Sequence, residues 1–358
     1  FATDYNLVQV PDPAGRSYAY VYDANGNLTS SADPLRNVSR FTFEGPLNRL
    51  GNVVDAKGIV TRYDHAETGN RLSITYADQS RESWGYDGFG NATWWTNRRG
   101  SPIEYRYDWA GHLTNKVFKD NSQAIYEYDT RGNMTNAATL DTNGLLTHCS
   151  LMAYDQNDRL TNITYPDDKW LAFTYDAPGR RASSLDQTGH LLLYAYDALG
   201  RLQSMTNELG QEIVRYTYDP AGRLQLKRVG NGVYTTYDYD HAGHLQRLTN
   251  HLAQGSAISW FNYTYDTRGR RTGMNTHYGK WAYGYDDLGQ LTRAVLASTD
   301  PDIPNQDLTY LYDALGNRLR TIENGVTTEY AANNLNQYVS VGSSHYVFDL
   351  DGNLTQDI

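Results

Sequence analysis

The sequence predicts an all-β fold in which tandem β-hairpins follow one another as a continuous spiral sheet, the wall of a hollow shell or tube. Three observations predict it: one motif returns along nearly the whole chain, its spacing stays nearly constant, and the composition favours strands. Of 358 residues, 31 are Tyr and 31 are Gly, whereas only 4 are Met. Tyrosine suits a strand that is packed on one side and hydrated on the other.

The repeated motif reads Y-x-Y-D-x-x-G-x-L-x, as in YVYDANGNLT. Three weaker copies lie at 41–50, 61–73 and 328–338, and most steps between copies are 20–23 residues, the period of an array of one supersecondary unit. We therefore expect residues 1–358 to form a single array of about 16 repeats, a segment of a longer protein. The thirteen clear copies lie at 20–29, 84–93, 105–114, 126–135, 152–161, 173–182, 194–203, 216–225, 237–246, 263–272, 283–292, 310–319 and 346–355.

Each copy predicts a strand, a tight turn and a return strand. Tyr20 and Tyr22 are two residues apart, so they share one face of the strand. Asp23 suits the first position of a type I turn, and Gly26 at the fourth can adopt φ > 0 and close the hairpin with a bulge. The residues expected in these turns are Asp23, Gly26, Asp87, Gly90, Asp108, Gly111, Asp129, Gly132, Asp197, Gly200, Asp219, Gly222, Asp240, Gly243, Asp266, Gly269, Asp286, Gly289, Asp313 and Gly316. The structural aromatic residues expected before them are Tyr20, Tyr22, Tyr105, Tyr107, Tyr126, Tyr128, Tyr194, Tyr196, Tyr216, Tyr218, Tyr263, Tyr265, Tyr310 and Tyr312.

A second turn is predicted between successive copies, because Asn231-Gly232 and Asn324-Gly325 are strong hairpin signals. Two departures from the common repeat lead to further predictions. Pro178 is disfavoured at the third position of a type I turn, so the turn at 176–179 should differ from the others. Three longer spacings, 129→155, 240→266 and 286→313, should be absorbed by longer loops on one rim.

The number of strands predicts the hollow wall. Sixteen hairpins give about 32 strands, whereas open sheets rarely exceed ~10 strands without curling and barrels of about 8 strands are already filled by side chains. The alternative is a β-propeller of eight blades, each built from two units. A propeller should show an alternation with a period of two units, and the sequence shows none.

The composition excludes several classes of function. A net charge of −10 and a pI of about 5.3 argue against nucleic-acid binding, which needs a basic face. No apolar run approaches the roughly 20 residues of a membrane span. Cys149 is the single cysteine, so no internal disulfide is possible.

The candidate chemical groups are better explained by the repeat. Thirteen equivalent aspartates indicate turn capping instead of catalysis. The segments 23–27 and 349–353 lack the sixth-position Gly and the Glu of a calcium loop, and His241 and His244 lie in a predicted turn instead of a zinc-binding helix. We therefore predict no catalytic residue, no cofactor and no metal site. Six tryptophans suit packing between hairpins more than stacking on sugars: Trp94, Trp95, Trp109, Trp170, Trp260 and Trp281.

The run of Y-x-Y-D-x-x-G-x-L-x units resembles the YD repeat of Rhs-type proteins, which include bacterial Rhs toxins, Tc toxin cocoon subunits and animal teneurins. The resemblance implies a hollow shell, which encloses an effector in the toxins and is part of an adhesive ectodomain in teneurins. The toxin members carry DPxGL-type motifs and an aspartate self-cleavage site after the repeats. Neither occurs in this sequence, so the resemblance carries over the wall alone.

We expect a non-enzymatic structural wall, a shell segment of a secreted or cell-surface protein that encloses cargo or a toxin domain. One alternative is a self-assembling extracellular filament or tube subunit. Another is a cell-surface adhesion or glycan-binding module. The expected partners are neighbouring repeats of the same or other copies through strand-edge pairing, an enclosed polypeptide and glycans, without nucleic acid or a membrane span.

Overall fold

The computed structural model describes residues 6–358, in which it contains 33 β-strands and no helix. Because it has no helix, this part of the chain has none that could cross a membrane. The chain divides into two compact units. Unit 1 comprises the described residues up to Pro102 together with Tyr263–Ile358, and unit 2 comprises Ile103–Asn262.

Unit 1 is made of two stretches of sequential strands. The first stretch contains β1 (Gln9–Pro11), β2 (Ser17–Tyr22), β3 (Leu28–Ala32), β4 (Val38–Glu44), β5 (Arg49–Val54), β6 (Val60–His65), β7 (Arg71–Thr75), β8 (Arg81–Tyr86) and β9 (Ala92–Thr96). The second contains β25 (Arg271–Thr276), β26 (Gly279–Tyr285), β27 (Leu291–Ser298), β28 (Gln306–Tyr312), β29 (Arg318–Glu323), β30 (Val326–Ala332), β31 (Tyr338–Val341), β32 (Ser344–Phe348) and β33 (Leu354–Asp357).

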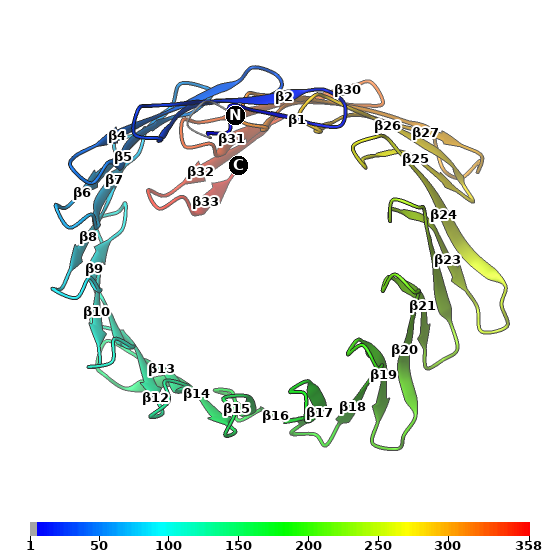
Figure 1. Ribbon diagram of the computed structural model, residues 1–358, viewed down its shortest axis with the longest axis horizontal. Helices are drawn as coiled ribbons and strands as arrows, with labels where there is room; N and C mark the ends of the chain where they lie inside the picture. Colours follow the sequence, from blue (N-terminus) through cyan, green and yellow to red (C-terminus); the bar gives the residue numbers. More distant parts are fainter. Residues whose placement is uncertain (1–5) are drawn as a thin grey trace. The chain divides into compact units, whose positions relative to one another are not determined.

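Unit 2 is a curved single layer of strands that follow in chain order (Figure 1). Its strands are β10 (Pro102–Tyr107), β11 (Leu113–Phe118), β12 (Gln123–Tyr128), β13 (Met134–Leu140), β14 (Leu146–Tyr154), β15 (Leu160–Thr164), β16 (Trp170–Tyr175), β17 (Arg181–Asp186), β18 (Leu191–Tyr196), β19 (Leu202–Asn207), β20 (Glu212–Tyr218), β21 (Leu224–Val229), β22 (Tyr234–Tyr239), β23 (Leu245–His251) and β24 (Ala257–Tyr265).

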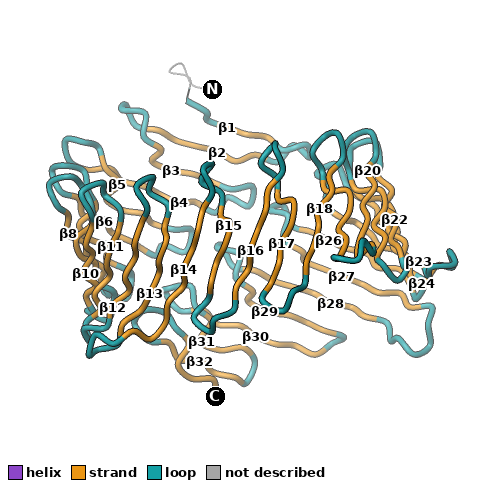
Figure 2. Tube along the Cα trace, turned by 90° about the horizontal axis from the view of Figure 1, so that it is seen from below, coloured by secondary structure: helices purple, strands orange, loops and turns teal. Residues whose placement is uncertain are grey.

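Within each unit, a strand pairs antiparallel with the strand before it and the strand after it, as in β17–β18, β18–β19 and β19–β20. The strands therefore form a meander and not a set of separate blades. This confirms the predicted all-β array of tandem hairpins over its propeller alternative. Turns line both ends of the strands (Figure 2). We call the turns that follow the Y-x-Y strands YD turns, and the turns between successive copies linking turns.

The pattern of burial is that of a wall one layer thick. In strands such as β18 the two tyrosines of the motif are half-buried while the residue between them is exposed, so the tyrosines share one face. Few apolar side chains are buried in residues 6–358, and those below about a tenth exposure are Ile74, Ala138, Phe173, Val214, Ala294 and Leu296. Backbone ladders and contacts between adjacent strands therefore hold the sheet together in place of a thick core.

The prediction that longer loops absorb the three long spacings is wrong for two of them. The extra residues at 141–148 and 251–259 mainly lengthen strands, so that β14 and β24 each reach 9 residues around ordinary four-residue turns. Only the third spacing contains a longer loop, at 299–305. An extra pair of residues on each strand adds ladder bonds, whereas a loop would leave the same backbone groups to solvent.

Four turns also depart from expectation. The turn at 176–179 keeps the common geometry, with Gly179 N donating to Asp176 O at 3.0 Å, because Pro178 removes only one side-chain bond from it. In the three weaker copies the turn starts one or two residues later than the acid or alanine that the motif suggested. These turns begin at Gly45, Ala66 and Asn333.

Candidate functional site

The aspartate that begins a YD turn binds the backbone of its own turn. In the first copy, Asn25 N and Asn27 N both donate to Asp23 Oδ1 at 2.9 Å. Gly26 N donates to Asp23 O at 3.1 Å, and Gly26 has φ 83°, a value that a residue with a Cβ rarely adopts. The carboxylate is therefore occupied by backbone donors and is not presented to a substrate.

In most YD turns the residue four positions after the aspartate binds the second carboxylate oxygen. Asn27 Nδ2 donates to Asp23 Oδ2 at 2.8 Å, and Asn133 does the same to Asp129 at 3.0 Å. These bonds to the charged form explain why the pKa of Asp129 is lowered to about 2, with the Asn133 side chain the main cause and the Asn133 backbone the next.

Where the residue four positions after the aspartate is arginine, its guanidinium also stacks on a tyrosine of the next copy. Arg201 Nε and Nη2 lie 2.7 and 2.6 Å from Asp197 Oδ2, and the guanidinium carbon lies 4.4 Å from the ring centroid of Tyr218 in the following copy. The bond from Arg201 lowers the pKa of Asp197. The same stacking joins Arg159 to Tyr175, Arg180 to Tyr196, Arg223 to Tyr239 and Arg270 to Tyr285.

The second tyrosine of the motif donates a hydrogen bond back to the preceding copy. Tyr218 Oη lies 2.8 Å from the carbonyl oxygen of Leu202, and burial raises the pKa of this phenol. Tyr218 therefore receives a cation on its ring and donates its proton to a backbone carbonyl. The other tyrosines that donate in this way are Tyr86, Tyr128, Tyr175, Tyr196, Tyr239, Tyr285 and Tyr312.

These links between copies are what sequence reasoning missed. The position after the turn glycine is occupied by Asn, Arg, His or Gln, but the local pattern did not indicate that this side chain binds the aspartate or, where it is arginine, the next tyrosine. A signal was present, because all these residue types carry an N–H donor of suitable reach.

A second site lies within unit 1, where the linking turns of β1–β9 meet the YD turns of β25–β33. Figure 2 shows β2–β4 beside β28–β30 in two levels. Four cations form five ion pairs that join the levels: Arg16 to Asp287 (2.7 Å), Arg268 to Asp12 (2.9 Å), Lys57 to Asp313 (3.0 Å), and Arg99 to both Asp351 and Asp349. We call this line of contacts the seam.

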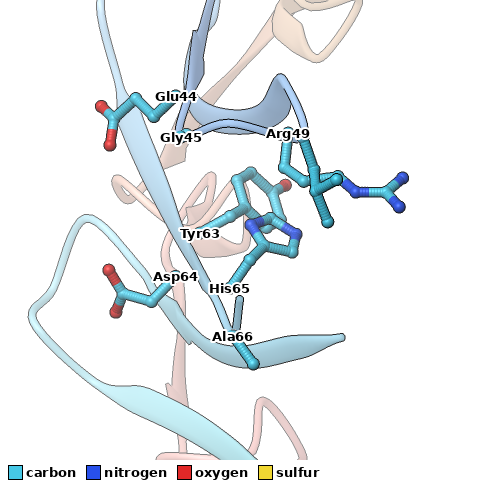
Figure 3. A pocket seen from close by; sticks show the side chains of 9 residues that line it. Glu44, Gly45, Arg49, Tyr63, Asp64, His65 and Ala66 are labelled. Carbon is cyan, nitrogen blue, oxygen red and sulfur yellow. The ribbon is translucent and has the colours of Figure 1, made fainter. Parts of the chain in front are cut away.

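A pocket of about 230 Å³ lies at two irregular YD turns, but its charged groups do not converge (Figure 3). The carboxylates of Glu44 and Asp64 point to one side, while the rings of Tyr63 and His65 and the Arg49 side chain lie on the other. Asp64 accepts a hydrogen bond from the buried hydroxyl of Ser73. The Ser73 hydroxyl is fully buried and therefore not accessible to a substrate, so the arrangement gives no basis for a catalytic assignment.

The other candidates from the sequence are engaged in turns and strands. His244 Nδ1 lies 3.0 Å from Asp240 Oδ2, in the position that Asn27 occupies in the first copy. The Cys149 thiol lies 3.2 Å from Asn136 Oδ1. Within residues 6–358 no three or more His, Cys, Asp or Glu side chains are grouped as metal ligands would be.

The tryptophans divide between packing and exposure. Trp281 stacks on Tyr283, with ring centroids 6.1 Å apart and planes 4° apart, as expected for packing within the wall. Trp109 differs, because it occupies the tip of a YD turn and is 99% exposed.

Comparison with protein families identifies the array. Residues 34–281 match the Teneurin YD-shell family, and residues 4–38 match the RHS Repeat. The chain belongs to the Teneurin YD-shell family. This YD-shell chain has no match among curated proteins.

Solved structures show the same fold at low sequence identity. The YD-shell chain is similar to TcdB2-TccC3 without its hypervariable C-terminal region, with a TM-score of 0.63, 16% identity, and coverage of 97% of this chain and 24% of that one. The TcdB2-TccC3-TEV structure has a TM-score of 0.62 at 16% identity, covering 97% and 25%. The Photorhabdus luminescens Tc holotoxin pore, in a TccC3 mutant, has a TM-score of 0.56 at 15% identity, covering 96% and 24%. The YD-shell chain thus spans about a quarter of the length of these structures.

Proposed function

We propose that this chain is a non-enzymatic segment of a shell that encloses a polypeptide cargo and belongs to a secreted or cell-surface protein. The carrying observation is that the repeated polar side chains bind one another from copy to copy, as in Asp197, Arg201 and Tyr218. Groups that in an enzyme would face a substrate are used here to extend a wall. The likeness to TcdB2-TccC3, part of a toxin complex, supports a toxin domain as the cargo.

The proposal gives the predicted side chains a structural role. The turn residues, such as Asp129 and Gly132, set the hairpin geometry, and the second tyrosine of each motif fixes the spacing of adjacent copies. The array of residues 1–358 acts as one continuous wall in the full-length protein.

Protease protection tests the enclosure. The full-length protein that contains this array is digested at graded protease concentrations, and the fragments are identified by mass spectrometry. We expect a segment outside the array to resist digestion until enough denaturant is added to unfold the array. Cargo enclosure would be contradicted by two results together: all segments outside the array are cleaved as fast as an unfolded chain, and electron microscopy shows an empty interior.

A filament or tube is the second candidate, and the terminal strands favour it. All residues of β1 (Gln9–Pro11) and β33 (Leu354–Asp357) are exposed, so each presents an accessible strand edge to another copy. Negative-stain images and light scattering across a concentration series distinguish the two. Long fibres whose mass grows with concentration support assembly, and a monomer at all concentrations rejects it.

A glycan-binding or adhesive surface is the third candidate. It is favoured by Phe89 and Trp109, which sit at the tips of YD turns with 95% and 99% of their surface exposed. Binding on a glycan array that is lost on Trp109→Ala would support it. If the protein binds no glycan on the glycan array, this candidate function is rejected.

A further inference from the structure

Two YD turns in unit 1 have twins of identical sequence in unit 2, and only the unit 1 copies lie in the seam. The turn 313–316 repeats the four residues DALG of 197–200. Leu199 is 78% exposed and Ala198 is exposed, whereas Ala314 and Leu315 are half-buried. Since the sequences are the same, the contacts of the seam account for the difference.

The second pair of twins is DTRG, at 129–132 and 266–269. The side chain of Arg131 is 40% exposed and pairs with Asp158 of the neighbouring YD turn. The side chain of Arg268 is only 14% exposed, and it pairs with Asp12 across the seam at 2.9 Å and donates to Asp287 O at 3.0 Å. The arginine of this turn therefore pairs with a neighbouring YD turn in unit 2, but with a linking turn across the seam in unit 1.

The linking turns of residues 6–102 are neutral overall, whereas those of unit 2 are acidic. The first set lies at 12–15, 33–36, 55–58, 76–79 and 97–100, and contains four cations, Arg36, Lys57, Arg98 and Arg99, and four acids, Asp12, Asp33, Asp55 and Asp78. The seven linking turns of unit 2 contain one cation, Lys119, against six acids: Asp120, Asp141, Asp167, Asp168, Asp186 and Glu208. The YD turns on the other side of the seam carry more acids than cations, so they would repel the second set more strongly than the first.

We infer that the seam is an ion-paired latch between the two levels of unit 1, which opens when its charges are screened or reversed while the strands stay folded. The ladders within each level consist of backbone hydrogen bonds that salt does not screen. The seam instead depends on side-chain ion pairs. Arg99 is 50% exposed, and Arg16 and Asp287 are 30% and 46% exposed, whereas Arg268 and Asp12 are each only 14% exposed. Exposed pairs weaken as the Debye length falls to about 3 Å in 1 M salt. This inference does not depend on cargo enclosure.

Two of the ion pairs allow a charge exchange that leaves the turns intact. Asp287 and Asp351 are not the capping residues of their turns, since Asp286 and Asp349 accept the backbone bonds. Reversal of the cations by Arg16→Asp and Arg99→Asp should open the latch. Adding Asp287→Arg and Asp351→Arg restores opposite charges across the seam and should close it again.

The matched control changes net charge by the same amount away from the seam. Arg106→Asp and Arg215→Asp alter exposed cations of unit 2, where each pairs with a glutamate on its own strand. The labels are placed on exposed strand positions by Arg62→Cys in β6 and Leu311→Cys in β28, in a Cys149→Ser background. The separation of attached spin labels then reports the seam, and circular dichroism reports the strands.

We expect one narrow separation in dilute buffer, and a longer, broader one in about 1 M NaCl with unchanged circular dichroism. The reversed variant should show the open distribution without salt, and the exchanged variant and the control should show the closed one. If salt and charge reversal both leave the separation unchanged, or if the control opens as far as the reversed variant, the latch is refuted. Should the reversed variant not fold, the salt series on the labelled parent decides alone.

Discussion

At the scale of single residues, five pairs of adjacent repeats are joined by a tyrosine that uses both its ring and its hydroxyl. Tyr218 receives the Arg201 guanidinium on its ring and donates a proton to Leu202 O. A phenylalanine would keep the ring and its stacking but lose the hydrogen bond. Tyrosine is therefore the residue that satisfies both contacts at this position of the repeat.

Removing one hydroxyl should measure this link. We expect Tyr218→Phe to lower the free energy of unfolding by about 1 kcal/mol, the usual net value of an intramolecular hydrogen bond. Urea denaturation followed by circular dichroism gives the value. Tyr216→Phe is the control, because Tyr216 makes no such bond to a backbone carbonyl in the described part of the chain. Equal losses for the two variants would contradict the assigned role.

The sequence could predict what happens inside one turn but not what happens between copies. Asp and Gly three residues apart indicate a turn wherever they occur. The contact of Arg159 with Tyr175 spans sixteen residues and depends on the pairing of adjacent hairpins, which no local pattern specifies. Likewise, no motif pairs Lys57 with Asp313, 256 residues away.

At the scale of the hairpin, one backbone position in each turn controls the geometry. The fourth residue of a YD turn has φ > 0 whether or not it is glycine, and most linking turns share this feature. In the linking turn 165–168 it is Asp168, with φ 61°, and in the next linking turn it is Gly189, with φ 87°. The repeat thus contains natural examples of both the relaxed and the strained residue.

Exchanging the residue types should move stability in opposite directions. We expect Asp168→Gly to raise the free energy of unfolding by up to about 1 kcal/mol, because glycine adopts the left-handed conformation without the cost borne by other residues. Gly189→Ala should lower it by about 1 kcal/mol, although a Cβ there meets nothing within 4 Å. Thermal unfolding of both variants provides the test, and a change of the same sign in both would show that φ is not the cause.

Strand lengths were the least predictable part of the hairpin. The sequence indicates where turns begin, because turn residues are distinctive, but an insertion can enter a strand or a loop. At 251–259 the residues Ser259 and Trp260 pair with Asn250 and Thr249, which lengthens the ladder. The outcome is decided by whether the adjacent strand offers backbone partners, and that is a property of the assembled sheet.

At the scale of the whole molecule, the repeated aspartates make stability depend on acid. Their pKa values are lowered: Asp129 to about 2 by its bonds from Asn133, and Asp186 to about 2 chiefly by the Thr188 hydroxyl. A carboxylate whose pKa is lower in the folded state adds stability above its unfolded pKa of about 3.9. That stability is lost as the pH falls toward the folded value.

We expect the urea midpoint to be constant from pH 7 to about pH 5 and to fall between about pH 4 and pH 2. Asp186→Asn serves as a variant with one fewer titrating group, since Asn207 caps the next linking turn through the same backbone bonds. Its midpoint should fall less steeply over this range. A midpoint that rises in acid, or an identical slope in the variant, would contradict the role of the turn carboxylates.

The spacing of the seam has a consequence for how such a chain can change in length. The residues that meet across the seam are 256, 254 and 252 residues apart in three hydrogen bonds and 271 residues apart in the Arg16–Asp287 ion pair, so the pairing depends on the length of chain in that interval. Gain or loss of one hairpin unit of 20–23 residues inside that interval would present Lys57 and its fellow cations to the wrong acidic turns. Duplication of a repeat inside this interval should therefore disrupt the seam, whereas duplication at the ends of the array should leave it in place.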